Sequence, residues 1–298
     1  MRSAESGKEP RLVLPAYGRI TAESLDPIEK KPLYHVLPGM PVWSIGFAGC
    51  NLHCPFCQNH GIARAPAGSG RFRSPAETVA RAKASGAMMI AYTYSEPSIH
   101  IEYVMDTARL AAEAGLLNIL VTNGNLNLRP ARELLDRMDA VNVDLKAWDP
   151  TYYAEILGGR LDTVREFISE ACRRSWVEVT TLVVPGDNDD LDDIGSMARW
   201  IAGLSPNIPY HLSAYHPAHR YTRPPTAESV IRRAADRARE YLNFVYPGNT
   251  GFEAHTECPA CGQPVIRRRW FRSESLLENG HCPDCGAALP GLFSVDQT

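Results

Sequence analysis

The stretch VWSIGFAGCNLHCPFC, residues 42–57, joins a predicted strand to a loop that carries three cysteines. Its first six residues, 42–47, form a short apolar run of the kind that becomes a buried strand. Cys50, Cys54 and Cys57 follow in the spacing CxxxCxxC. A complete [4Fe-4S] ligand shell takes four thiolates, so three on one loop predict a cluster with one iron left open. An open coordination position is typical of a catalytic metal centre rather than a structural one.

A structural zinc site is the alternative for this loop, because His53 and His60 lie close enough in sequence to supply a fourth ligand. We favour the cluster over zinc. A zinc knuckle normally pairs CxxC with a second ligand pair, and the two other CxxC pairs of the chain match each other.

The composition narrows the class of protein. Among 298 residues, 31 Lys and Arg stand against 34 Asp and Glu, which gives no global argument for a nucleic-acid or anionic-membrane partner. No apolar run is long enough to span a bilayer and the N-terminus has no signal-type h-region, so we expect a cytoplasmic protein without a membrane partner. In such a protein eight cysteines are more typical of metal ligands or redox groups than of disulfides. Seven fall into two clusters, and Cys172, alone, is expected to be a small core residue.

The middle of the chain alternates short apolar runs with longer amphipathic ones, which predicts parallel βα units. We expect a partial (β/α)6 TIM-like barrel with its chemistry at the carboxyl ends of the strands, and a doubly wound open sheet is the alternative. The expected strands are 42–47, 88–93, 118–122, 140–145, 177–184 and 210–214, with 243–246 as a candidate seventh. The expected helices are 75–86, 98–115, one opening at Pro130, 161–174, 190–204 and 226–241, the first with Ser74 as N-cap and Glu77 completing a capping box.

We expect three parts: an N-terminal extension (1–41) packing on the barrel, the barrel itself (42–250) and a four-cysteine module (251–298). Within the module, Cys258-Pro-Ala-Cys261-Gly and Cys282-Pro-Asp-Cys285-Gly form two knuckles. Their spacing predicts a closed tetrahedral site of zinc-ribbon or rubredoxin-like type. Zinc is the first candidate, and iron is the alternative, which would allow an electron relay to the catalytic cluster. Between the knuckles, RRRWFR (267–272) is interpreted as a hairpin strand with an exposed charged face rather than an RNA contact.

CxxxCxxC after the first strand, with Phe56 before the last cysteine, resembles the signature of the radical S-adenosylmethionine (SAM) superfamily. In that superfamily the amino and carboxylate groups of SAM chelate the open iron, and the reduced cluster cleaves SAM to methionine and a 5′-deoxyadenosyl radical. The resemblance therefore implies a [4Fe-4S] cluster, SAM and a low-potential electron donor such as flavodoxin or ferredoxin.

The resemblance extends to polar residues at the ends of successive strands. It implies that Glu96 receives the amino group of SAM, where the superfamily usually has a GGE-type stretch. Thr122 and Asn123 would hydrogen-bond the ribose hydroxyls or simply form a turn. The expected SAM-contacting residues are Phe56, Tyr94, Ser95, Glu96, Thr122, Asn123, Asp144, Lys146, Thr181, Tyr215 and His216.

Two of these positions resemble the activating enzymes of glycyl-radical enzymes in particular. Asp144-Leu145-Lys146 is similar to their DLK stretch near the polar end of SAM, where a buried lysine suits the SAM carboxylate. Tyr215-His216 is similar to their YH stretch near the adenine. An activating enzyme is therefore one alternative function.

Most of the chain is most similar to the radical SAM member of the AmmeMemoRadiSam system. The resemblance is carried by GRITAESLDPIEKKPLYHVLPG (18–39), CQNHGIA (57–63), YTYSEP (92–97) and the YPGNTG…TECPACG tail (246–262). It implies Amme-type and Memo-type proteins as partners and leaves the substrate open among small molecules, peptides and RNA. A non-catalytic iron–sulfur and zinc protein that binds nucleic acid or carries electrons is the alternative from another class.

Overall fold

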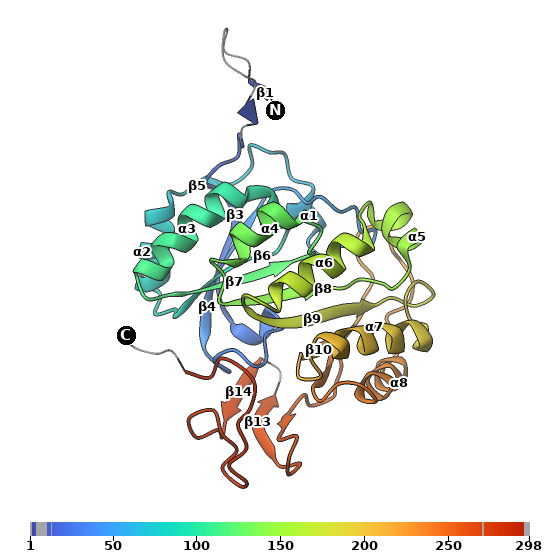
Figure 1. The fold of residues 1–298 in the computed structure, drawn as a ribbon. Coiled ribbons are helices and arrows are strands. Elements are labelled where there is room, and N and C mark those ends of the chain that lie inside the picture. Colours follow the sequence, from blue (N-terminus) through green and yellow to red (C-terminus); the bar gives the residue numbers. More distant parts are fainter. Residues whose placement is uncertain (1, 4–10, 13, 270, 295–298) are drawn as a thin grey trace.

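The computed structural model describes residues 2–3, 11–12, 14–269 and 271–294. A nine-stranded sheet forms its centre, and helices cover one face of this sheet (Figure 1). The strands of the sheet are β3 (Arg19–Pro27), β4 (Pro41–Phe47), β5 (Arg71–Phe72), β6 (Met89–Thr93), β7 (Leu117–Thr122), β8 (Ala140–Asp144), β9 (Trp176–Val183), β10 (Tyr210–Ala214) and β11 (Val245–Gly248). The α-helices are α1 (His60–Ala63), α2 (Pro75–Ala84), α3 (Ile101–Glu113), α4 (Leu128–Leu135), α5 (Pro150–Tyr152), α6 (Leu161–Ala171), α7 (Leu191–Leu204) and α8 (Glu228–Arg239). A short antiparallel pair, β1 (Arg2–Ser3) and β2 (Arg11–Leu12), precedes the sheet.

The sheet is an open α/β sheet with the order β11-β10-β9-β8-β7-β6-β4-β3-β5. All neighbours from β4 to β11 pair in parallel, whereas β3 is antiparallel to both β4 and β5. The predicted partial barrel is thus confirmed as an open sheet rather than a closed barrel. The candidate seventh strand is present as β11, so the parallel part has one strand more than the six expected.

Alternate side chains of each strand face opposite sides of the sheet. On the helix side, residues such as Ile45, Tyr92 and Val143 are fully buried in the main apolar core. On the other side, residues such as Val42 and Met89 belong to a second, smaller core near the amino ends of the strands. We call the face of the sheet opposite the helices its inner face. Toward the carboxyl ends of the strands, this inner face reaches the loops that carry predicted site residues.

The segment between β3 and β4 fills the second core. Ile28, Leu33 and Val36 are fully buried there, each contributing on the order of 2 kcal/mol of hydrophobic stabilisation. The fully buried Glu178 carboxylate of β9 accepts hydrogen bonds from the backbone N–H groups of Tyr34 (2.9 Å) and the next residue (2.8 Å). These contacts close the amino end of the sheet.

Two helix starts differ in detail from expectation. Ser74 caps α2 by accepting from the backbone N–H of Glu77 (3.2 Å), but the Glu77 carboxylate binds Arg73 (2.8 Å) instead of completing the capping box. A charge-assisted bond to a guanidinium is stronger than one to a backbone amide, which explains the difference. α4 begins two residues before Pro130, which is tolerated because the first-turn N–H groups have no partner inside a helix.

The helix expected at 98–115 has a separate first turn. Residues Pro97–His100 form a 3₁₀ turn, η2, before α3, and Glu96 caps this turn by accepting from the backbone N–H of Ser98 (3.0 Å).

The C-terminal part forms a three-stranded antiparallel sheet of β12 (Thr256–Glu257), β13 (Pro264–Arg269) and β14 (Arg272–Ser275). The pairing of β13 with β14 confirms that RRRWFR is part of a hairpin, with Trp270 outside the described residues. The expected exposed charged face is wrong for Arg268, whose side chain is buried and bonds the Tyr34 carbonyl. This sheet lies below the main sheet in Figure 1. The backbone of Leu37 donates to the carbonyl of Leu292 (2.7 Å), so the module contacts the segment that closes the amino end of the sheet.

The three-cysteine loop (50–57), in contrast, follows the carboxyl end of β4. The two cysteine groups therefore lie toward opposite ends of the sheet, an arrangement that argues against an electron relay between them. In the described ranges, no helix combines the length and the apolar character that crossing a membrane requires.

Candidate functional site

The three-cysteine loop is folded against its neighbours by backbone contacts. The N–H of His53 donates to the carbonyl of Leu157 (2.7 Å), and the N–H of Arg220 donates to that of Pro55 (2.9 Å). The guanidinium of Arg64 donates to the carbonyl of Leu52 (2.9 Å). The loop thus has a defined shape set by residues from three other segments.

The spacing of the thiols separates this loop from the tail site. Within the described part of the chain, the ligand atoms of Cys258, Cys261, Cys282 and Cys285 all lie within 4.8 Å of one another, and the loop cysteines form no such group. Thiolates around a single tetrahedral ion lie roughly 3.8 Å apart, given metal–sulfur bonds of about 2.3 Å. A cluster spreads its ligated irons over separate corners and needs wider spacing. Among the described residues, neither His53 nor His60 joins the loop cysteines in a metal-ligand group, so the loop does not have the close spacing of a single zinc site.

The environment of Cys50 and Cys54 also fits a cluster. Burial raises the pKa of Cys50 to about 11 and also raises the pKa of Cys54, so both are thiols without a metal. Sγ of Cys50 accepts from the backbone N–H of Leu52 (3.4 Å) and from Nδ2 of Asn123 (3.7 Å), contacts suited to a thiolate bound to iron. The nearby Lys146 ammonium acts on Cys54 in the opposite sense to burial and favours its thiolate.

Glu96 joins the loops after β6 and β7. Its carboxylate is buried and accepts from the backbone N–H of Ser98 (3.0 Å), the hydroxyl of Thr122 (2.8 Å) and the backbone N–H of Asn123 (2.8 Å). Burial raises the pKa of Glu96 against the opposing effect of these donors. Three of the predicted residues, Glu96, Thr122 and Asn123, are thus brought together in one hydrogen-bonded unit.

Tyr94 is held by residues that the sequence patterns missed. Its backbone is left-handed (φ +68°), and its ring lies against Gly46, where an added Cβ would come within 2.9 Å of the ring. Its hydroxyl donates to Oδ2 of Asp26 (2.5 Å), which also accepts from the buried ammonium of Lys31 (2.8 Å). Burial raises the pKa of Tyr94 to about 12, aided by Asp26. The neighbouring Ser95 hydroxyl donates to the backbone of β4 and is used locally.

Asp144, the last residue of β8, forms an ion pair of 2.8 Å with Lys146, whose side chain is 15% exposed. Burial disfavours the ammonium, but Asp144 and Cys54 outweigh this effect and raise the pKa of Lys146. Asn188 donates to the backbone carbonyl of Lys146 (2.6 Å) and fixes the turn. The Lys146 side chain therefore stays positively charged beside the three-cysteine loop.

The remaining predicted residues are dispersed. Phe56 is buried, with its ring centroid 5.9 Å from that of Tyr221. Tyr215 is buried, and His216 is exposed. Thr181 lies on the helix side, where its hydroxyl contacts the Leu145 carbonyl (2.5 Å) and the Tyr210 hydroxyl (2.8 Å), so it is not brought together with the others.

Asp187 is a further residue without a sequence signal. Its carboxylate is 6% exposed and accepts from the hydroxyls of Tyr152 (2.8 Å) and Tyr221 (2.9 Å) and from Arg223. It therefore ties three loops together at the carboxyl end of the sheet.

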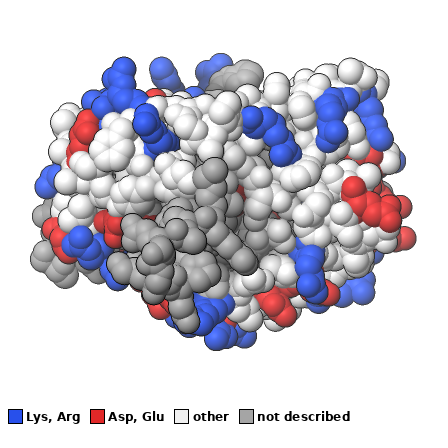
Figure 2. All heavy atoms as spheres, turned by 90° about the horizontal axis from the view of Figure 1, so that it is seen from above, with Lys and Arg blue, Asp and Glu red and all other residues white. Residues whose placement is uncertain are grey.

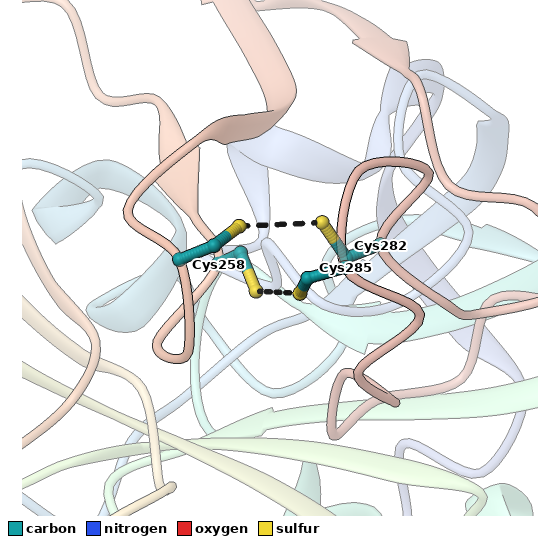
Figure 3. Close-up of side chains that lie close together, drawn as sticks. Cys258, Cys282 and Cys285 are labelled. Atoms are coloured by element: carbon teal, nitrogen blue, oxygen red, sulfur yellow. Dashed lines mark hydrogen bonds between the residues drawn. The ribbon is translucent and has the colours of Figure 1, made fainter.

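The four tail cysteines point toward one another from two turns, as Figure 3 shows for Cys258, Cys282 and Cys285. Sγ of Cys258 lies 3.6 Å from that of Cys285, and Sγ of Cys261 lies 3.7 Å from that of Cys282. These distances match the edge of a tetrahedron around one zinc or iron ion. Burial opposes ionisation of Cys258, but backbone N–H groups outweigh it and lower its pKa to about 7. The tail group is a metal site on geometry and on donor chemistry.

Seen from above, Lys and Arg form separate groups around the margin rather than one continuous basic patch (Figure 2). A hollow of about 790 Å³ at the amino end of the sheet, lined by residues such as Asn118 and Trp176, contains none of the predicted site residues.

Comparison with known proteins agrees with this geometry. Residues 44–201 match the Radical SAM superfamily. An uncharacterized protein of Methanocaldococcus jannaschii is 36% identical over 284 residues, which cover 92% of this chain and 84% of the relative. A probable GTP 3′,8-cyclase of Methanococcus vannielii is 24% identical over 268 residues, covering 83% of this chain and 88% of the relative.

Two solved structures share the fold. SuiB of Streptococcus suis, bound to S-adenosylmethionine, matches with a TM-score of 0.58 at 14% identity, over 75% of this chain and 53% of SuiB. A radical SAM methyltransferase of Sphaerobacter thermophilus matches with a TM-score of 0.52 at 19% identity, over 70% of this chain and 66% of that protein. At these identities the likeness concerns the fold alone. The superfamily match and the extended identity to the archaeal relative lead to one conclusion: the chain belongs to the radical SAM superfamily.

Proposed function

We propose that the protein is an enzyme that binds a [4Fe-4S] cluster through Cys50, Cys54 and Cys57 and binds SAM at the open iron. When bound, the reduced cluster supplies reductive cleavage of SAM to a 5′-deoxyadenosyl radical, which abstracts hydrogen from a substrate that is still to be identified. The observation that carries the proposal is the CxxxCxxC loop with its three thiols, placed at the carboxyl end of the sheet beside the Lys146 ammonium.

The charged groups around the loop suit the polar end of SAM. The Lys146 ammonium, kept charged by Asp144, would bind the SAM carboxylate. Glu96 is our candidate for the amino group of SAM. A carboxylate has about four lone-pair positions, and protein donors occupy three of those of Glu96. Tyr94 and Tyr215 are further candidates for contacts with SAM.

We further propose that the protein is the radical SAM member of an AmmeMemoRadiSam system. The segments 18–39 and 246–262, which carry that resemblance, are the ones that close the amino end of the sheet and open the four-cysteine module. Zinc is our first assignment for the tail site, with iron as the alternative. Amme-type and Memo-type proteins and a low-potential donor such as flavodoxin or ferredoxin are the proposed partners.

The test is anaerobic reconstitution with iron and sulfide, followed by dithionite and SAM. We expect 5′-deoxyadenosine from the native chain and none from Cys54→Ala. Cys172→Ala is the matched control, because Cys172 lies at the end of α6, outside both cysteine groups, and should leave product formation unchanged. An intact cluster that yields no 5′-deoxyadenosine would overturn the proposal and favour a non-catalytic role.

Deuterium transfer separates the enzyme classes. With deuterated candidate small molecules, peptides or RNA, label appearing in 5′-deoxyadenosine identifies the substrate. Label appearing only from a protein backbone glycine would instead identify an activating enzyme of a glycyl-radical enzyme, the alternative that rests on Asp144 and Lys146.

A further inference from the structure

The side chain of Asn123 lies against the first cysteine of the loop. Its Nδ2 is 3.7 Å from Sγ of Cys50 and 2.8 Å from Oδ1 of Asn51. Asn123 follows β7 and lies 73 residues from Cys50 in sequence, so the contact is a product of the fold. It places a polar N–H group beside a proposed cluster ligand.

The orientation of this carboxamide is fixed by its neighbours. Oδ1 of Asn123 accepts from the backbone N–H of Asn125 (2.8 Å), a group that can only donate. The opposite end must therefore be Nδ2, and it faces the sulfur. Asn51 agrees with this assignment, because its own Nδ2 donates to the carbonyl of Asn125 (2.9 Å) and leaves its Oδ1 to accept.

The backbone of Asn123 is fixed as well. Its N–H donates to Oε2 of the buried Glu96 (2.8 Å), and the N–H of Gly124 donates to the hydroxyl of Thr122 (3.1 Å). Gly124 is left-handed (φ +67°), and an added Cβ would lie 2.9 Å from a methyl group of Val143. The turn is thus locked, and the N–H group reaches the sulfur without freedom to rotate away.

The three loop thiols differ in this respect. Cys50 receives the backbone N–H of Leu52 and the side-chain N–H of Asn123. In the ranges that the structure describes, no side chain donates to Cys54 or Cys57 within hydrogen-bonding distance. Cys50 is therefore the ligand with a dedicated side-chain donor.

We infer that Asn123 is a positioning residue that sets the reduction potential of the cluster through Cys50, an inference that rests on the proposed function. A cluster gains negative charge when reduced, and an N–H group aimed at a ligand sulfur stabilises the reduced form more than the oxidised form. The donor therefore makes the cluster easier to reduce. Both ends of the carboxamide are used within the protein, so this role replaces the contact with the ribose hydroxyls that the sequence suggested.

The test is a redox titration of the reconstituted chain without SAM, followed by electron paramagnetic resonance. Asn123→Asp keeps the size and the bond from Asn125 but removes the N–H, and Asn123→Leu removes it without adding charge. At a fixed solution potential we expect the ratio of reduced to oxidised cluster to fall about tenfold in Asn123→Leu, equal to about 59 mV for one electron. It should fall further in Asn123→Asp, because the carboxylate adds negative charge. Asn127→Asp is the matched control, because Asn127 is exposed and precedes α4 without a side-chain hydrogen bond. The reduction potential of the cluster should be unchanged in this variant.

Unchanged potentials in both Asn123 variants would overturn the inference. A second measurement needs no variant. In native protein labelled with ¹⁵N-asparagine, pulsed electron paramagnetic resonance of the reduced cluster should detect a coupling between the cluster spin and the side-chain nitrogen of Asn123. Absence of that coupling would overturn the inference even where the variants fail to retain a cluster. A chain whose cluster shows the coupling yet forms no 5′-deoxyadenosine would contradict the proposed function alone.

Discussion

Nε2 of His35 lies 2.7 Å from the hydroxyl of Tyr246, which links the segment before β4 to the last strand of the sheet. Nδ1 of His35 lies 2.7 Å from the carbonyl of Pro290, which can only accept, so Nδ1 carries the proton and Nε2 accepts from Tyr246. Thr256 then donates to Tyr246 (2.8 Å) and accepts from Arg268 (2.7 Å). For a neutral imidazole, the form that burial favours, every donor in this chain of bonds has an acceptor.

We expect this network to make the protein acid-sensitive. Burial lowers the pKa of His35 from 6.5 to about 4, with Arg268 adding to the effect and Glu178 opposing it. The unfolded chain takes up a proton near pH 6.5 that the folded chain accepts only near pH 4. Stability is therefore full above pH 6.5 and falls as the pH drops toward 4, by up to about 3 kcal/mol. Urea unfolding at a series of pH values measures this loss.

His35→Gln should remove this component of the pH dependence. The control is His216→Gln, since His216 is exposed and its replacement should leave the dependence in place. An identical slope in native chain and His35→Gln would show that other groups cause the acid sensitivity.

The fold was predictable because its signals are local. Strands such as 88–93 are short apolar runs, and an amphipathic run that forms a helix follows each of them along the chain. The cysteine spacing likewise needs no knowledge of the fold. The contacts of Tyr94 with Asp26, 68 residues away, and of Tyr152 with Asp187, 35 residues away, have no local signal.

The errors have a related cause. Thr181 was expected at the site because it lies near a strand end, but side chains alternate between the faces and Thr181 points to the helices. A shift of one residue, to Thr180, reaches the inner face, where its hydroxyl bonds Asn142. The sequence thus predicted how far along the strand a residue lies, but not which side of the sheet its side chain faces.

Lys146→Met should weaken SAM binding without preventing cluster assembly. The ammonium is largely buried and interacts with Cys54. Losing a buried charge partner costs about 2 kcal/mol or more, which corresponds to an affinity lower by about thirtyfold or more. The change in the resonance spectrum of the reduced cluster on adding SAM measures the affinity. Lys83→Met, on the exposed face of α2, is the matched control. Equal SAM affinity in Lys146→Met and the native chain would remove Lys146 from the proposed SAM site.

Asp187→Asn should loosen the loop 216–226. The carboxylate serves two tyrosine hydroxyls and Arg223, and an amide in its place turns a donor toward one of them at a cost of about 1–3 kcal/mol. Hydrogen exchange of residues 216–226 should accelerate. Asp192→Asn is the control, because the Asp192 side chain is 96% exposed. Unchanged exchange in Asp187→Asn would mean that Tyr221 is held by its packing on Phe56 instead.

Cys282→Ala should unfold the tail module while the main sheet remains folded. The apolar core of the module is small, with Val265, Ile266 and Leu289 as its buried members besides two cysteines, so the metal supplies much of its stability. We expect loss of one zinc or iron per chain, rapid proteolysis between residues 256 and 292, and retention of cluster iron. Cys172→Ala should change none of these. Protection from proteolysis in metal-free Cys282→Ala would show that docking, rather than the metal, stabilises the module. The docking contacts are those of Leu292 with Leu37 and of Arg268 with the Tyr34 carbonyl.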